Sequence, residues 1–194
     1  MRVLVVHAHP VETSFSRSLF KAVVEVLGAG GHTVDGLNLY DEKFDAALSR
    51  AERIRYEDVP GNITPELEIH VERLRAANAI VFVHPVWNYG YPAILKGYFD
   101  RVFLPGVSFV LEDGEVKPNL RNIRKAEFVT TYGGDRWRTR LMGDPPRRLA
   151  RRWAWATFRT KTPPKYLALY DMNNNREPQL TAFLGKVRKE FSRW

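Results

Sequence analysis

The sequence predicts an α/β protein built on a doubly wound, five-stranded parallel sheet with helices on both faces. Short β-branched and apolar runs alternate about five times with amphipathic helical segments. Parallel strands need crossover connections, and these place helices on both faces of the sheet. The 194 residues, of which 44% are hydrophobic and 27% charged, suit a globular protein with a full core. We therefore expect one domain over residues 1–194.

The first half of the chain supplies three strands and three helices. Apolar, β-branched or alternating residues predict strands at Val3–Val6, Thr33–Leu39 and Ala79–His84. Helical spacing and capping residues predict helices from Phe15 to the glycines at 28–31, from Pro65 to about Asn78, and over Pro92–Phe103. A short helix over Ala46–Tyr56 is also expected.

The second half continues the alternation after one excursion. Val107–Val116, with Asp113-Gly114 at its middle, reads as a hairpin. Strands are then predicted at Ala126–Thr131 and Tyr166–Tyr170, and helices over Pro145–Phe158 and Glu177–Phe191.

Composition excludes several kinds of site. The chain has no cysteine, which rules out disulfides, thiolate metal sites, iron–sulfur clusters and a cysteine nucleophile. Any redox chemistry must therefore come from a bound cofactor. No apolar run approaches the ~20 residues of a membrane helix, and the apolar run after Met1 is shorter than a secretory signal. We expect a cytoplasmic protein without membrane insertion.

Three predicted strands end in unusual loops, read as HAHPVETSFS, HPVWNYGYP and TTYGGDRW. In a doubly wound sheet, ligands bind outside the carboxyl ends of the strands. The first loop leads into a helix amino terminus with nearby hydroxyls, which suits a phosphate. The second offers aromatic rings and Gly90, which suit a planar ring, and the third adds hydroxyls and paired glycines. Together the loops predict a pocket for a molecule with a ring at one end and a phosphate at the other.

These same residues carry a family resemblance. AHPVETSFS, PVWNYGYPAILKGYFDRVF and TTYGG make the chain resemble the flavodoxin-like NAD(P)H:quinone oxidoreductases, including the flavoprotein partners of bacterial potassium-efflux systems. The resemblance covers roughly residues 1–134. It implies a flavodoxin-like fold, a bound FMN or FAD, NAD(P)H as co-substrate, and hydride transfer through the flavin to a quinone or similar acceptor.

The resemblance also implies which residues form the flavin site. For the phosphate and ribityl region these are His9, Ser14, Phe15 and Ser16. For one side of the isoalloxazine ring they are Pro85, Val86, Trp87, Asn88, Tyr89 and Gly90. For the other edge they are Thr130, Thr131, Tyr132 and Gly133. We expect Gly90 to serve by a positive φ or by keeping side-chain atoms away from the ligand.

The chain departs from the family pattern near the third loop. Tyr132 replaces a glycine after the paired threonines, and the tyrosine and histidine that members place shortly downstream have no match in DRWRTRLMGDPP. Proton donation to the reduced acceptor therefore falls to Tyr132, Tyr89 or solvent.

Several alternatives remain open at this point. The net charge of +8 lies entirely in residues 136–161, with nine basic residues against Asp144, while 21 basic and 21 acidic residues balance elsewhere. Arginines interleaved with tryptophans suit a nucleic-acid-binding module, although we expect no nucleic acid, and arginine also suits the 2′-phosphate of NADPH. His7, His9 and His84 are a further, less favoured metal-ligand set, and no metal is expected. The family also implies homodimers and, in some members, docking as a flavin-bearing regulatory subunit on a transporter.

Overall fold

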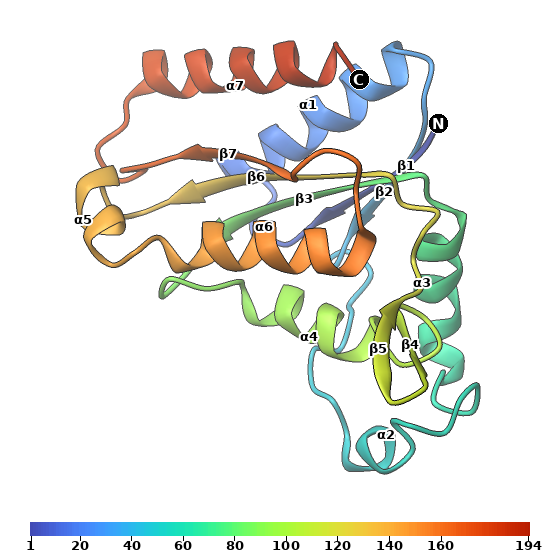
Figure 1. Cartoon of the computed structure of the whole chain (residues 1–194). Helices are drawn as coiled ribbons and strands as arrows, with labels where there is room; N and C mark the ends of the chain where they lie inside the picture. Colours follow the sequence, from blue (N-terminus) through green and yellow to red (C-terminus); the bar gives the residue numbers. More distant parts are fainter.

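A five-stranded parallel sheet with the strand order β2-β1-β3-β6-β7 forms the centre of the computed structural model, which describes residues 1–194 (Figure 1). Its strands are β1 (Arg2–His7), β2 (Thr33–Asn38), β3 (Ala79–Val86), β6 (Lys125–Tyr132) and β7 (Lys165–Leu169). Every neighbouring pair is parallel. The predicted five-stranded parallel sheet is confirmed.

Alternation along the inner strands builds a core on each face of the sheet. In β1, Leu4 and Val6 belong to one buried cluster, whereas Val3 and Val5 belong to the other. Successive side chains of a strand point to opposite faces, so an all-apolar run needs cover on both. The short apolar strands therefore dictate a three-layer arrangement.

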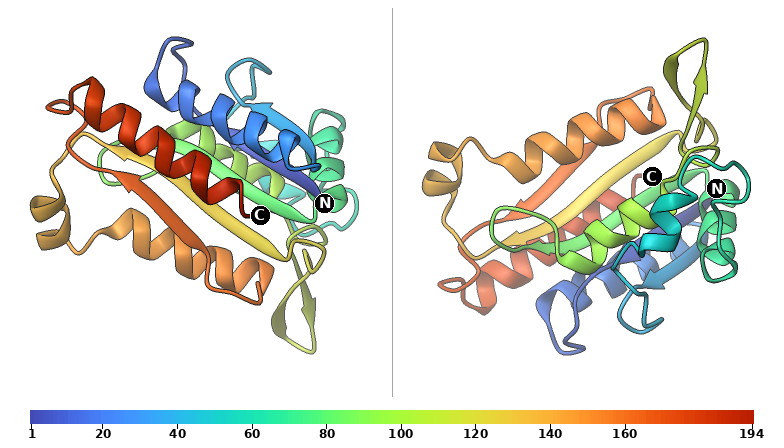
Figure 2. Two further views of the ribbon diagram at one scale, coloured as in Figure 1. Left: turned by 90° about the horizontal axis from the view of Figure 1, so that it is seen from above. Right: turned by 90° about the horizontal axis from the view of Figure 1, so that it is seen from below.

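Helices supply that cover. They are α1 (Phe15–Ala29), α2 (Arg50–Ile54), α3 (Pro65–Ala76), α4 (Ala93–Val102), α5 (Arg136–Leu141), α6 (Pro145–Phe158) and α7 (Glu177–Phe191). Helices α1 and α7 pack side by side on one face, while α3, α4 and α6 contribute to the core on the other (Figure 2). None of the helices combines the length and the apolar character needed to cross a membrane.

Two helices differ from the sequence expectation. The segment expected to be helical over Ala46–Tyr56 is helical only in α2, because Ser49 starts the helix with a capping box. Its hydroxyl accepts from the Glu52 amide at 3.1 Å, and the Glu52 carboxylate accepts from the Ser49 amide at 2.8 Å. Helix α5 was not predicted; Asp135 caps it by accepting from the Arg138 amide at 2.9 Å.

The predicted hairpin is confirmed as strands β4 (Phe109–Glu112) and β5 (Glu115–Pro118), which pair antiparallel. Asp113 and Gly114 form its turn, both with positive φ, as a two-residue hairpin turn requires. Figure 2 shows the hairpin projecting from the body of the molecule.

The topology also fixes where a ligand pocket should lie. From β1 the chain goes to β2 on one side and later to β3 on the other, so the strand order reverses between β1 and β3. Crevices form outside the carboxyl ends of the strands at such a switch point. The loops after β1, β3 and β6 all leave the sheet at this edge.

Candidate functional site

A cleft of about 440 Å³ opens at the carboxyl edge of the sheet, between the loops that follow β3 and β6. The β3 side contributes Val86, Trp87, Asn88 and Tyr89, and the β6 side contributes Tyr132, Gly133, Gly134 and Thr139. Six of these eight residues are among those predicted from the sequence. The two loops that were expected to face each other across a planar ligand therefore line one cavity.

The aromatic wall is held in place by a tight turn. Trp87 and Gly90 exchange two backbone hydrogen bonds, of 3.2 Å from Trp87 N and 2.9 Å from Gly90 N. The two residues between them, Asn88 and Tyr89, have φ of 48° and 55°, which is the geometry of a type I′ turn. The turn leaves the side chains of Trp87 and Tyr89 each 41% exposed beside the cleft.

The expectation of a positive φ at Gly90 is wrong, because the left-handed residues of the turn are Asn88 and Tyr89. A Cβ at Gly90 would meet only the Trp87 carbonyl oxygen, at 3.7 Å, which is ordinary contact. Gly90 does not line the cleft. The left-handed conformations that this turn requires are therefore taken by Asn88 and Tyr89, not by Gly90.

Gly133 and Gly134 form a side-chain-free part of the cleft wall. Neither has a positive φ. A Cβ on Gly133 would meet only Asn173 at 3.7 Å, and one on Gly134 only Thr139 at 3.7 Å. The amides of both glycines have no acceptor within the protein. This strip lets a flat ligand approach the backbone and offers it two N–H donors.

The loop after β1 meets the cleft through His9, whose ring lies edge-on to Trp87 at 5.8 Å between centroids. Beyond it, the Ser14 hydroxyl caps α1 by accepting from the Arg17 amide at 3.2 Å. The amides of Phe15 and Ser16 have no acceptor within the protein. Free N–H groups and the positive end of the helix dipole suit an anion such as a phosphate.

Other predicted residues support the cleft from below. Pro85, Thr130 and Thr131 are buried in β3 and β6, and Pro85 pairs with Thr131 in the sheet register. Ser16 is only 4% exposed, and its hydroxyl lies 3.3 Å from the imidazole of His7. These side chains shape the site without lining its cavity.

Tyr132 is tied into a buried polar network. Its hydroxyl donates to the Asp144 carboxylate at 2.8 Å and lies 2.6 Å from the Tyr166 hydroxyl, which is left as the donor of that second bond. Tyr170 donates to the same carboxylate at 3.0 Å and stacks on Tyr132 with ring centroids 4.5 Å apart. Burial raises the pKa of Tyr132 far above its ordinary value. The network fixes the wall of the cleft at its β6 side.

The three histidines weighed as metal ligands do not form a cluster with one another. His7 is buried against Phe20 and Ser16, and the imidazole of His84 bonds the Pro85 carbonyl at 2.8 Å. Burial lowers the pKa of both to about 4. Both are neutral structural groups at neutral pH.

Sequence reasoning missed Gly134, Thr139 and Asp144. Gly134 stands beside the predicted Gly133, and Thr139 reaches the cleft because α5 turns it inward, where its hydroxyl donates to the Asp135 carbonyl at 2.8 Å. The Asp-Arg-Trp-Arg pattern after Gly134 was the available signal, since Asp is a favoured helix cap. Asp144 had no local signal, because its contact with Tyr132 forms only when the folded chain brings the two side chains together.

Comparisons with known proteins agree with this architecture. A family model described as a flavodoxin-like fold matches residues 1–188. The chain is 33% identical over 132 residues to an uncharacterized NAD(P)H oxidoreductase of Haemophilus influenzae, an alignment covering 67% of this chain and 64% of that protein. The aligned part covers between 54% and 64% of the first curated relatives.

Two solved structures extend the likeness over nearly the whole chain. An NAD(P)H:quinone oxidoreductase from Methanothermobacter marburgensis has a TM-score of 0.85 at 25% identity, covering 99% of this chain and 98% of that one. An FMN-dependent NADH-azoreductase of Bacillus anthracis, solved in complex with FMN, shares the fold with a TM-score of 0.75 at 20% identity and the same coverage. With the family model matched from the first residue to 188, the chain belongs to the flavodoxin-like fold family.

Proposed function

We propose that the protein is an NAD(P)H-dependent flavin oxidoreductase that passes two electrons through a bound flavin to a quinone or a similar small acceptor. The observation that carries this proposal is the cleft between the β3 and β6 loops, with an aromatic wall on one side and a glycine wall on the other. The NAD(P)H oxidoreductase names of its relatives support the same reaction class.

The residues present fit FMN or FAD. Trp87 and Tyr89 would pack against one part of the isoalloxazine ring, and the strip at Gly133 and Gly134 would admit its opposite edge without a side-chain clash. The α1 amino terminus would take the phosphate, because its free amides and helix dipole favour negative charge. The phosphate would thus lie at the loop after β1, and the ring would lie between the loops after β3 and β6.

The protein's own groups would bind and orient, while the flavin would supply hydride acceptance and donation. The free amides of Gly133 and Gly134 would donate to the ring edge, where fixed dipoles favour the negative charge that arrives on reduction. The turn at Trp87–Gly90 would hold the facing wall rigid, since its backbone groups are already paired with each other. Nicotinamide and acceptor would use the open side of the cleft in turn.

Tyr89 is the better placed of the two predicted proton donors. Its side chain is 41% exposed on the cleft wall, whereas Tyr132 is 2% exposed and its hydroxyl proton is already donated to Asp144. We assign proton donation to Tyr89, with solvent as the competing source. Tyr132 is then a positioning residue.

A homodimer is part of the proposal. Trp87 and Tyr89 expose large aromatic rings at the mouth of the cleft, a pattern typical of a surface that another molecule covers. Sedimentation of the flavin-loaded protein at micromolar concentration should give twice the 22.4 kDa chain mass. A monomer under those conditions would remove the dimer from the proposal.

The function is tested by an anaerobic spectrum. The purified protein, after incubation with FMN and FAD separately, should show flavin absorption that NADH or NADPH bleaches and that added quinone restores. Mass analysis of the released nucleotide identifies the flavin. Failure to bind either flavin would refute the proposal, and bleaching without turnover of free acceptors would instead favour a flavin-bearing subunit of a larger assembly.

A further inference from the structure

The amino-terminal half of α6 forms one wall of a second, strongly basic groove. Its four arginines follow a helical repeat that gathers them on one side within about two turns. The groove has a volume of about 430 Å³ and is lined by Arg147, Arg148, Arg151, Arg152, Trp155, Pro163 and Pro164. It lies between α6 and the segment that leads into β7, the edge strand of the sheet.

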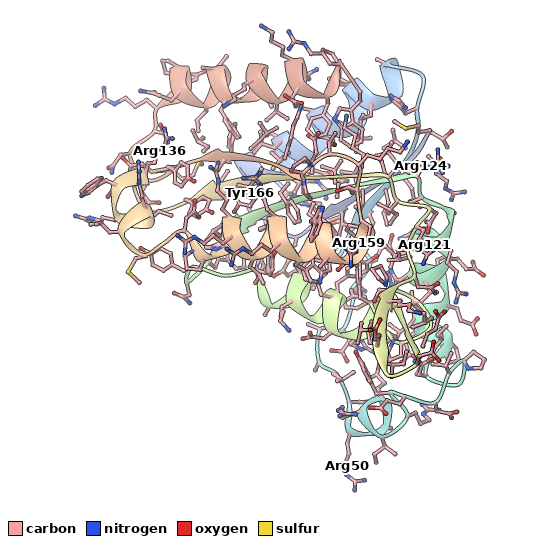
Figure 3. The ribbon with its side chains drawn as sticks, viewed as in Figure 1. Arg50, Arg121, Arg124, Arg136, Arg159 and Tyr166 are labelled. Atoms are coloured by element: carbon pink, nitrogen blue, oxygen red, sulfur yellow. The ribbon has the colours of Figure 1, made fainter.

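Two of the arginines are fixed in place by the backbone of β7 and of the segment that leads into it. Arg147 donates to the Tyr166 carbonyl at 3.3 Å and lies over the Tyr166 ring, and Arg151 donates to the Pro164 carbonyl at 3.2 Å. Figure 3 labels Tyr166 below the ribbon of β7, to which it belongs, on the side toward α6. These contacts pair two carbonyl groups along the outer edge of the sheet and organise the basic wall.

The positive charge of the groove is not balanced. Asp144, 3.6 Å from Arg147, is the only acidic residue of the segment 136–161, and its oxygens already accept from Tyr132 and Tyr170. Arg148 and Arg152 are exposed and belong to none of the chain's ion pairs or side-chain hydrogen bonds. Guanidinium groups that repel one another at close range favour an anion with several oxygens, above all a phosphate.

The groove begins beside the wall of the candidate flavin cleft. Asp144 holds Tyr132, which lines that cleft, and also stands at the amino terminus of α6. With a rise of 1.5 Å per residue, Arg148 and Arg152 stand about 6 and 12 Å further along the helix axis. A ligand with one end in the cleft and an extended, phosphate-bearing end would reach the groove around the sheet edge.

We propose that this groove binds the 2′-phosphate and pyrophosphate of NADPH, with Arg148 and Arg152 as the residues that favour NADPH over NADH. The proposal rests on the function proposed above. Trp155 provides an apolar wall beside the arginines, and the other side of the groove is formed by Pro163 and Pro164, so a nucleotide would meet both charge and an apolar surface.

A nucleic acid is a poorer occupant of the same groove. Strands of several nucleotides need a basic track that follows the backbone, and the unbalanced charge here is confined to one segment while the rest of the chain carries equal numbers of acidic and basic residues. The site is sized for one nucleotide.

The test compares Arg148→Gln/Arg152→Gln with a charge-matched control, Arg50→Gln/Arg55→Gln. Arg50 lies on α2, at the far end of the molecule from Arg136 (Figure 3). Calorimetric titration with adenosine 2′,5′-bisphosphate and with 5′-AMP measures the groove directly, without flavin or turnover. We expect the groove variant to lose about tenfold or more in affinity for the bisphosphate only, and the control to keep parental affinity.

Steady-state kinetics completes the design. The groove variant should show a KM for NADPH raised about tenfold with little change in the KM for NADH, and Arg148→Lys/Arg152→Lys should recover part of the loss. Equal loss for both nucleotides, unchanged bisphosphate affinity, or loss of salt-sensitive oligonucleotide binding with bisphosphate binding intact would overturn the proposal. If the parent binds the bisphosphate but no flavin, the proposed function fails while the groove assignment as a phosphate site stands.

Discussion

At the scale of single residues, the glycines of this site do not supply the left-handed conformations of its loops. Gly90, Gly133 and Gly134 all have ordinary φ values, whereas Asn88 and Tyr89 take the left-handed conformation. Such a residue costs on the order of 1–3 kcal/mol and persists only where its surroundings hold it. Gly133 and Gly134 are useful for the side-chain-free wall that they give the cleft. Sequence alone cannot separate these two uses of glycine, because both need only a missing Cβ.

The assignment of Tyr89 as proton donor predicts a clear contrast between two hydroxyl deletions. Tyr89→Phe should lower turnover with a quinone by about tenfold or more, since positioned acids contribute at least that much, while flavin affinity stays near the parental value. Tyr132→Phe removes one of the two tyrosine donors to Asp144 and the hydroxyl partner of Tyr166, and should cost about 1–3 kcal/mol of unfolding free energy. Stopped-flow reoxidation and urea unfolding measure the two effects. The reverse pattern would move the acid to Tyr132.

At the scale of elements, the family-typical stretch PAILKGYFDRVF proves to be structural in several of its residues. Arg101 is 4% exposed on α4, and its guanidinium donates twice to the Glu52 carboxylate, at 2.8 and 2.7 Å. It also donates to the Asp45 carbonyl, which anchors the segment before α2. Gly97 on the same helix lies against the backbone of Ala46. These residues of the stretch thus hold neighbouring segments in place and do not line the cleft.

A methyl group at Gly97 should therefore be expensive. Its Cβ would lie 2.2 Å from the Ala46 carbonyl oxygen, a backbone atom that cannot move aside cheaply. We expect Gly97→Ala to lower the free energy of unfolding by about 2 kcal/mol or more. Gly185→Ala on α7 is the control, since a Cβ there meets nothing within 4 Å and alanine favours a helix. Urea midpoints that shift equally in both variants would contradict this reading.

Most elements were predictable from the chain because periodicity and caps are local. The exceptions show where local signals end. Helix α5 has only six residues, too few to show a repeat, and its cap Asp135 was its one local mark. Helix α2 begins only at the Ser49 cap, and the segment before that cap stays outside the helix because Gly97 and Arg101, about fifty residues away in the chain, hold its backbone.

At the scale of the whole molecule, the buried carboxyl of Glu127 makes the stability of the fold depend on pH. It is 1% exposed on β6, 3.8 Å from the Lys125 ammonium, and Lys165 and Glu190 also act on it. Burial raises the pKa of its carboxyl from 4.5 to about 7. The folded protein therefore holds this proton over a range in which the unfolded chain has lost it. Its contribution to stability is complete below pH 4.5 and is lost as the pH rises through 7.

Glu127→Gln removes that titration while keeping the shape of the side chain. The variant should gain about 3 kcal/mol of unfolding free energy relative to the parent when the pH rises from 4.5 to 8. Buried histidines such as His7 and His84, whose lowered pKa values weaken the fold as the pH falls from 6.5 toward 4, are common to both proteins and cancel in the comparison. Urea unfolding at both pH values measures the difference, and a constant difference would contradict the burial argument.

The loops that form the candidate site could be predicted from the sequence, whereas the side-chain hydrogen bonds that hold it could not. Strand-end loops follow from topology, and the family resemblance implies which of their residues meet the ring, so Trp87, Tyr89 and Gly133 could be named from the sequence. The bond from Tyr132 to Tyr166 crosses 34 residues, and no local pattern announces it. Side-chain networks of this kind appear only once the sheet brings their strands together.

The central claim is that the cleft at Gly133 and Gly134 holds the flavin ring. Flavin fluorescence quenching should be titrated in the parent, in Gly133→Val/Gly134→Val, and in Gly185→Val, whose position is equally open but lies on α7 away from the cleft. Circular dichroism confirms folding of each. We expect the cleft variant to lose about a hundredfold or more in flavin affinity, equivalent to about 2.7 kcal/mol, and the α7 variant to match the parent. Parental affinity in a folded Gly133→Val/Gly134→Val protein would show that the ring binds elsewhere.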